Sequence, residues 1–203
     1  MPRPNRTRRA LVRNSLLLFL AFCAVALLLL LWRQTPRPQA QLPEVSRADL
    51  VLRAGLWYQA GQTNPFTGWL VEFYQPGSLR SRSVVSNGLL NGVSEGWYTN
   101  GQIQVREHFK DGISHGWRQK WHENGSNLSE ATIVEGKIVG TFRSWHDNGQ
   151  LAEQIEMRQG NPDGVAFAYY PSGFLKARTR VEDGKILEQK SWHDGETRSP
   201  ATE

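Results

Sequence analysis

Glycine recurs along this chain with a fixed period of 24 residues, in three separate columns. Fifteen of the 19 glycines lie on this lattice. A constant period of this length is typical of proteins in which one small supersecondary unit is stacked many times. Such an architecture favours a binding surface over a buried catalytic pocket. The columns are Gly68, Gly92, Gly116, Gly140 and Gly164; Gly77, Gly101, Gly125, Gly149 and Gly173; and Gly88, Gly112, Gly136, Gly160 and Gly184.

Within one period the residues alternate as strand residues do. In the period that starts at Gly92, an apolar segment ends at Trp97-Tyr98, and Asn100-Gly101 follows. Asn and Gly tolerate the positive φ of tight hairpin turns. A second alternating segment leads to another turn at Asp111-Gly112. The pattern predicts an all-β fold: a single-sheet antiparallel meander of 24-residue β-hairpin repeats, with strands of about six to eight residues.

Equivalent residues of neighbouring repeats should lie two strands apart, about 9–10 Å along the sheet. Two columns are expected to share one face and to give it an apolar band. For the aromatic column that begins at Phe73, the alternative role is a stacking platform for sugars, lipid headgroups or peptide. We expect the second-column glycines to form turns. The two apolar columns are Phe73, Trp97, Trp121, Trp145 and Tyr169; and Val85, Phe109, Ile133, Met157 and Val181.

One residue further along, an amphipathic column points to the other face. An exposed aromatic row can mark a contact surface, so this column is the candidate binding surface; the alternative is a row of ordinary surface residues. Two histidines in it are about 10 Å apart, which is too sparse for a Zn²⁺ site, and we expect no metal or cofactor. We find no nucleophile elbow, metalloprotease helix or phosphate loop and expect no enzyme. The column is Tyr74, Tyr98, His122, His146 and Tyr170.

The N-terminal segment differs from the rest of the chain. Residues 1–40 hold seven arginines and no acid, so the other residues carry 17 basic and 19 acidic groups, about −2. Nucleic-acid binding is therefore not expected. Residues 14–32 are uncharged and apolar, and 19 residues of helix reach about 28 Å, enough for a bilayer core. The preceding arginines predict a cytoplasmic N-terminus and extracytoplasmic repeats. A cleaved secretory signal is the alternative.

The expected organisation is a basic cytoplasmic tip (1–13), a transmembrane helix (14–32), a Pro-containing linker (33–50), the repeat domain (51–195) and a polar tail (196–203). Asp49–Tyr58 reads as a strand or short helix leading into the repeats. The single cysteine, Cys23, lies in the anchor, so the exported part has no disulfide. A truncated last repeat at Trp192-His193-Asp194-Gly195 reads as a cap.

The repeating unit, G-x₄-W/F/Y-Y/H-x₂-G-x-L, resembles the MORN-repeat variant of bacterial proteins, over about residues 50–195. The segment Asn64-Pro65-Phe66-Thr67-Gly68, preceded by Gly55-Leu56-Trp57-Tyr58, resembles the start of proteins named as YwqK-family antitoxins. In the third unit the apolar residue after the turn moves from position 127, which is Asn, to Leu128.

Two functions follow. The first is a membrane-tethered, non-catalytic module, single-pass, that binds a protein or envelope component through its sheet surface or an exposed edge. The second, implied by the resemblance, is an antitoxin or immunity protein that sequesters a toxin. The sequence sets neither the ligand nor the oligomeric state.

Overall fold

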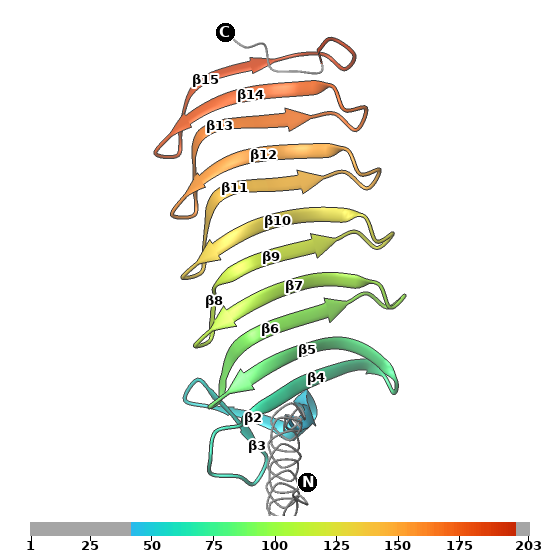
Figure 1. The fold of residues 1–203 in the computed structure, drawn as a ribbon, viewed down its shortest axis with the longest axis vertical. Helices are drawn as coiled ribbons and strands as arrows, with labels where there is room; N and C mark the ends of the chain where they lie inside the picture. Colours follow the sequence, from blue (N-terminus) through green and yellow to red (C-terminus); the bar gives the residue numbers. More distant parts are fainter. Residues whose placement is uncertain (1–41, 198–203) are drawn as a thin grey trace, which may run out of the picture. The chain divides into compact units, whose positions relative to one another are not determined.

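The computed structural model describes residues 42–197. They form a 13-stranded sheet and a separate two-stranded sheet, joined by turns and one short 3-10 helix, η1 (Arg47–Asp49). The strands from β4 to β15 pair side by side and antiparallel in chain order, except that the short β8 pairs only with β7, which also pairs with β9 (Figure 1). The predicted all-β meander is therefore confirmed. No helix in the described range is long and apolar enough to span a bilayer. The predicted basic tip and transmembrane helix lie outside the described residues.

Most repeat strands are eight or nine residues long, slightly longer than expected. We number the repeats 1 to 5 from the first-column glycines, so that they begin at residues 68, 92, 116, 140 and 164. The strands are β4 (Gly68–Gln75), β5 (Ser78–Ser86), β6 (Leu89–Trp97), β7 (Ile103–Lys110), β8 (Ile113–Ser114), β9 (Gly116–Trp121), β10 (Asn127–Val134), β11 (Lys137–Trp145), β12 (Leu151–Arg158), β13 (Asn161–Tyr169), β14 (Leu175–Glu182) and β15 (Lys185–Ser191).

The turns along one end of the strands are two-residue hairpin turns in which both residues have positive φ. Asp111 has φ 51° and Gly112 has φ 81°, and the same pair of angles recurs at the equivalent turns. This is the type I′ geometry, whose twist matches that of the strands it joins. The third glycine column is thus required by the left-handed backbone, as expected.

The turns at the other end have a different geometry from the one expected. Only the glycine is left-handed, with φ of 84° at Gly101, and Asn100 is not among the residues with positive φ. The Gly101 N–H donates to the Tyr98 carbonyl at 3.0 Å, which makes a three-residue loop closed by glycine. Asn100 contributes its side chain instead: Oδ1 accepts from the Gln102 N–H, and Nδ2 donates to the Glu123 carbonyl of the next repeat.

The two apolar columns lie on opposite faces, so the prediction of one shared apolar face is wrong. The cause is a β-bulge. Phe73 pairs with Leu79, but Glu72 pairs with Ser81, so Arg80 is an extra residue. Because side chains alternate along a strand, one extra residue moves everything after it to the other face. The same shift recurs after Ile103, Asn127, Leu151 and Leu175.

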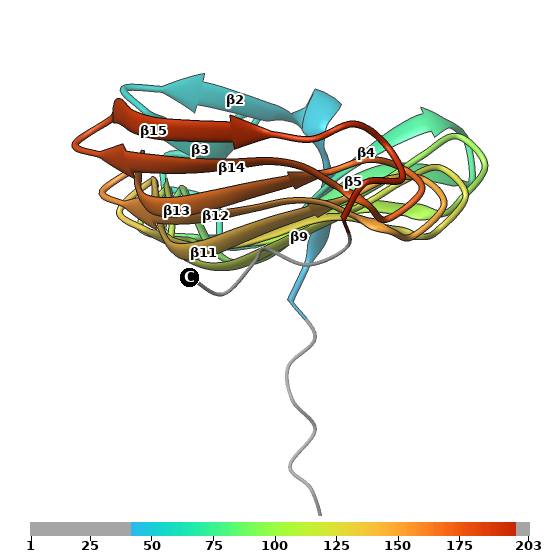
Figure 2. The same ribbon diagram turned by 90° about the horizontal axis from the view of Figure 1, so that it is seen from above.

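The Val85 column therefore lies on the face that we call the hairpin face, because the β2–β3 hairpin packs on it. β2 (Leu50–Arg53) and β3 (Leu56–Gln59) pair antiparallel, and Figure 2 shows β2 set to one side of the stacked strands. Leu50, Phe66, Leu70 and Val85 form the buried cluster beneath it. The segment expected as a strand or short helix is thus a hairpin that covers the first repeat.

Further contacts extend the pairing at the two ends of the sheet. β1 (Glu44–Ser46) pairs in parallel with β4, so the folded part begins before the expected boundary at residue 51. At the far end the truncated turn continues the pattern: the Trp192 carbonyl accepts from Tyr170 Oη at 3.1 Å. The Thr197 carbonyl accepts from the Leu175 N–H. Repeat 3 keeps its register, because Asn127 pairs with Trp121 as Ile103 pairs with Trp97.

The substitution Gly125→Val should destabilise the protein by about 1–3 kcal/mol, because φ is 85° there. A Cβ at this position would lie 3.4 Å from Gln102 Oε1, an ordinary contact, so the cost comes from the backbone rather than from crowding. Urea unfolding measures it. The matched control is Glu123→Ala in the same exposed turn, which should change stability little; equal stability of Gly125→Val and wild type would refute the turn geometry.

Candidate functional site

The five residues of the predicted binding column form a ladder between repeats. Each side chain bonds through its polar tip to the backbone carbonyl of the aromatic residue 22 or 23 positions later. Tyr98 Oη donates to the Trp121 carbonyl at 2.8 Å, and His122 Nε2 reaches the Trp145 carbonyl at 2.9 Å. Because a carbonyl only accepts, each histidine must carry a proton on Nε2. The other three pairs are Tyr74 to Trp97, His146 to Tyr169 and Tyr170 to Trp192.

This ladder explains why Tyr and His can replace one another in the column. Both are aromatic side chains with a donor at the tip, and the donor is what the next repeat requires. A second ladder runs beside it: Asn100, Asn124 and Asn148 each donate from Nδ2 to a carbonyl in the following turn. The polar tips of the candidate column are therefore engaged in joining repeats, and only the ring faces remain for a ligand.

The Phe73 column lies on the opposite face, which we call the aromatic face. Its members are half-buried, except Phe73, which is 43% exposed. Partial burial raises the pKa of Tyr169, because the phenolate would be less well solvated there. The strand registers place further aromatic residues on this face, including Trp117, which is 42% exposed. The full set is Trp69, Phe73, Trp97, Trp117, Trp121, Trp145, Phe167 and Tyr169.

A continuous polar rung crosses the middle of the aromatic face. Each of its residues is the direct cross-strand partner of the next, over seven consecutive strands. Cross-strand pairs of opposite charge stabilise a sheet, whereas like charges directly opposite destabilise it. The order along the rung is Arg82, Glu95, Arg106, Gln119, Glu130, Arg143 and Gln154.

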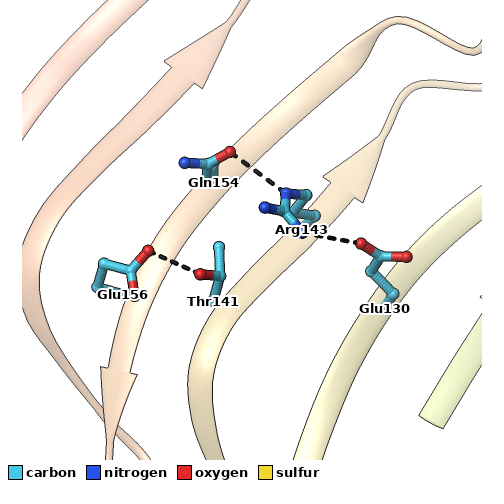
Figure 3. Close-up of polar contacts among 5 residues, drawn as sticks. All are labelled: Glu130, Thr141, Arg143, Gln154 and Glu156. Atoms are coloured by element: carbon cyan, nitrogen blue, oxygen red, sulfur yellow. Dashed lines mark hydrogen bonds and ion pairs between the residues drawn. The ribbon is translucent and has the colours of Figure 1, made fainter. Parts of the chain in front are cut away.

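Five of the seven side chains of this rung bond to a neighbour within it, as Figure 3 shows for repeats 3 and 4. Arg143 donates to Glu130 at 3.1 Å and to Gln154 at 3.3 Å. Next to them, Thr141 Oγ1 donates to Glu156 Oε1 at 2.8 Å. In repeat 2, Arg106 and Glu95 form an ion pair at 2.8 Å. The arginines are 40–48% exposed and their glutamates 18%, so the guanidinium groups face solvent.

Sequence reasoning missed this rung. The sequence pattern predicts that the face of the Tyr74 column is made more polar by basic residues such as Arg80, Arg82, Lys176, Arg178 and Arg180. The strand registers instead place Arg82, Arg178 and Arg180 on the aromatic face. The signal was in the sequence: Glu95 to Arg106 and Arg143 to Gln154 are each 11 residues apart and Glu130 to Arg143 is 13. The bulges hide which of these spacings places two residues opposite one another.

The described residues contain no group of three or more His, Cys, Asp or Glu side chains placed to hold a metal ion. His122 and His146 each bond a carbonyl of the following repeat instead. The last strand, β15, is exposed along its whole length, with Ile186 64% and Leu187 55% exposed.

Replacing Tyr98 by Phe should cost about 0.5–1.5 kcal/mol, because the Trp121 carbonyl loses its donor while the ring remains. His122→Tyr is the matched substitution and should cost less, since tyrosine bonds the same carbonyl in repeats 1, 2 and 5. Thermal and urea unfolding compare the two. A neutral Tyr98→Phe together with a costly His122→Tyr would show that the ladder does not hold the repeats together.

In comparisons with known proteins, residues 90–111 and 138–159 match the family model of the MORN repeat variant. The two matches begin 138 − 90 = 48 residues apart, which is two periods of the glycine lattice. Each covers a pair of strands, β6–β7 and β11–β12. No curated protein matched the chain. Repeats of this type generally mediate binding to proteins or membranes and are typically non-catalytic.

Proposed function

We propose that the repeats form a non-catalytic module that binds a protein through the aromatic face. The observation that carries the proposal is the composition of that face. Tryptophan, tyrosine and arginine are the residues most enriched at the energetic centres of protein interfaces. Five tryptophans share it, namely Trp69, Trp97, Trp117, Trp121 and Trp145, with arginines beside them.

The geometry supports this choice over the hairpin face. The hairpin face is covered at its first repeat by β2 and β3 through the cluster that includes Leu50 and Val85. On the aromatic face Arg106 and Arg143 are held by Glu95 and Glu130, so their guanidinium groups are pre-positioned. Pre-organised side chains lose less entropy on binding. A partner with acidic and apolar residues at a spacing of about 9–10 Å would match the repeat.

The predicted transmembrane helix at 14–32 would hold this module at the extracytoplasmic side of a membrane, in the periplasm or at the cell surface. That localisation rests on the sequence, and protease mapping that finds the repeats in the cytosol would contradict it. The toxin-neutralising role stays a prediction of the family resemblance.

Site-specific photocrosslinking with the full chain in cells tests the binding face. A photoreactive phenylalanine derivative at Trp117 should give a discrete protein adduct, because this side chain is exposed on the aromatic face. The same derivative at Glu153, which is exposed on the hairpin face, is the control and should give none.

A second arm uses the double variant Glu95→Arg with Arg106→Glu, which keeps an ion pair at this place but exchanges the positions of its two charges. The Trp117 adduct should weaken in this variant, while the unfolding midpoint changes little. Adducts of equal yield from Trp117 and Glu153, or none from Trp117, would be inconsistent with the proposal.

A further inference from the structure

The hairpin face contains a hollow of about 440 Å³ between repeats 2 and 3. β7 contributes Val105 and Glu107 to it and β9 contributes Arg118 and Lys120. Gln104, the ring of Tyr98 and the side chain of Leu128 complete its lining. The strand registers place Val105, Glu107, Arg118 and Lys120 on the hairpin face, so this hollow is separate from the surface proposed above.

The repeats themselves show which of these residues the fold does not require. Positions equivalent to Arg118 hold Leu70, Ser94, Phe142 and Ala166, none of which is charged. Positions equivalent to Glu107 hold Ser83, Ala131, Ile155 and Thr179, which are also uncharged. Since all five repeats have the same pairing pattern, packing does not demand charges here.

Leu128 is a third departure from the repeat. In repeats 1, 2, 4 and 5 the apolar residue after the turn is at the position equivalent to 127, which faces the tryptophans. In repeat 3 that position is Asn127, and the leucine occupies the bulge position, where the other repeats carry Arg80, Gln104, Ala152 and Lys176. Three departures thus converge on one hollow, although they come from three different strands.

The charges in the hollow do not cancel. Glu107 accepts a hydrogen bond from Ser114 Oγ at 2.5 Å and lies 3.6 Å from Arg118 Nη1, so the guanidinium has a counter-ion. Lys120 is half-buried and, within residues 42–197, its side-chain ammonium forms no salt bridge or hydrogen bond. Two cations against one anion leave about one positive charge beside the apolar surfaces of Val105 and Leu128. A charged group that is partly shielded from water interacts more strongly with a counter-ion than an exposed one does.

We propose that this hollow binds a carboxylate attached to a short apolar group. The carboxylate would meet the Lys120 ammonium, and the apolar group would lie against Val105, Leu128 and the ring of Tyr98. Two sources have this chemistry: a free small acid, and the C-terminal residue of a peptide. The proposal does not depend on the aromatic face, so either can fail alone.

The test is a chemical-shift titration of the ¹⁵N-labelled full chain with N-acetyl-L-leucine, following the amides of Val105, Lys120 and Leu128. Saturable shifts are expected at these amides and not at Gly160, in a distant turn. N-acetyl-L-leucinamide has the same shape without the charge and should bind at least about tenfold more weakly. Sulfate should compete poorly, because it lacks the apolar group.

Variants assign the effect to residues. Lys120→Gln should weaken binding at least about tenfold, whereas Lys137→Gln, at an exposed position at the start of β11, should not change it. Leu128→Ala should weaken it too, and the amide spectra of the variants outside the hollow must match wild type. A peptide ending in leucine that binds more tightly than N-acetyl-L-leucine would identify a protein C-terminus as the source. Equal affinities would identify a small acid.

Absence of saturable shifts in the wild-type chain would overturn the proposal. Equal binding of the acid and its amide, or unchanged binding by Lys120→Gln, would overturn it as well.

Discussion

Lateral pairing of strands in a constant 24-residue register is the constraint on which the rest of this structure depends. Beyond the first repeat, which β2 and β3 cover, no second layer packs on the sheet in the described part of the chain. Few side chains are fully buried: only Val85, Ile133 and Leu175 among the larger ones of the described residues. Backbone hydrogen bonds between neighbouring strands, together with the Tyr/His and Asn ladders, therefore supply much of the order. Both ladders require that every turn lie directly beside the next one. Inserting a single residue within a repeat would therefore break one hydrogen bond of the Tyr/His ladder and one of the Asn ladder.

A constant register also makes equivalent positions comparable. The five repeats show which residue types the sheet accepts at each place, because they share one pairing pattern. Tyrosine and histidine exchange freely where a donor must reach a carbonyl, as at Tyr98 and His122. Charged residues at Glu107 and Arg118 are exceptions at positions that otherwise hold uncharged residues. We therefore take such exceptions as candidates for ligand binding, because the architecture does not require them.

Much of the fold could be predicted from the spacing of glycine, because a left-handed turn residue is the one feature that a strand cannot supply in another way. Asp111-Gly112 and Gly101 are turns in the structure as the lattice indicates. The assignment of faces could not be predicted, since the bulge residue Arg80 has no distinctive sequence and its presence reverses the face of Val85. The pairing of β1 with β4 could not be predicted from the sequence either, because β1 lies outside the repeats and has no equivalent in them.

The candidate sites show the same division. Tyr98 and His122 were recognisable as a row, but the carbonyl partners that occupy their tips became visible only with the turn geometry. In the sequence, Arg118 and Lys120 look like ordinary surface charges on a strand. Their place beside Leu128 depends on the bulge after Asn127. Turns and residue columns that follow the 24-residue period can thus be predicted from the sequence. Contacts that depend on the pairing register of two neighbouring strands cannot.

Distances between spin labels at equivalent exposed turn residues test the constant register most directly. With Cys23 replaced, labels at Thr99 and Asp147 are two repeats apart, and labels at Thr99 and Pro171 are three repeats apart. At about 4.7–4.9 Å per strand, the account predicts about 19 Å for the first pair and about 29 Å for the second. Similar distances for the two pairs, or a second distance shorter than the first, would contradict a single sheet that grows by one hairpin per repeat.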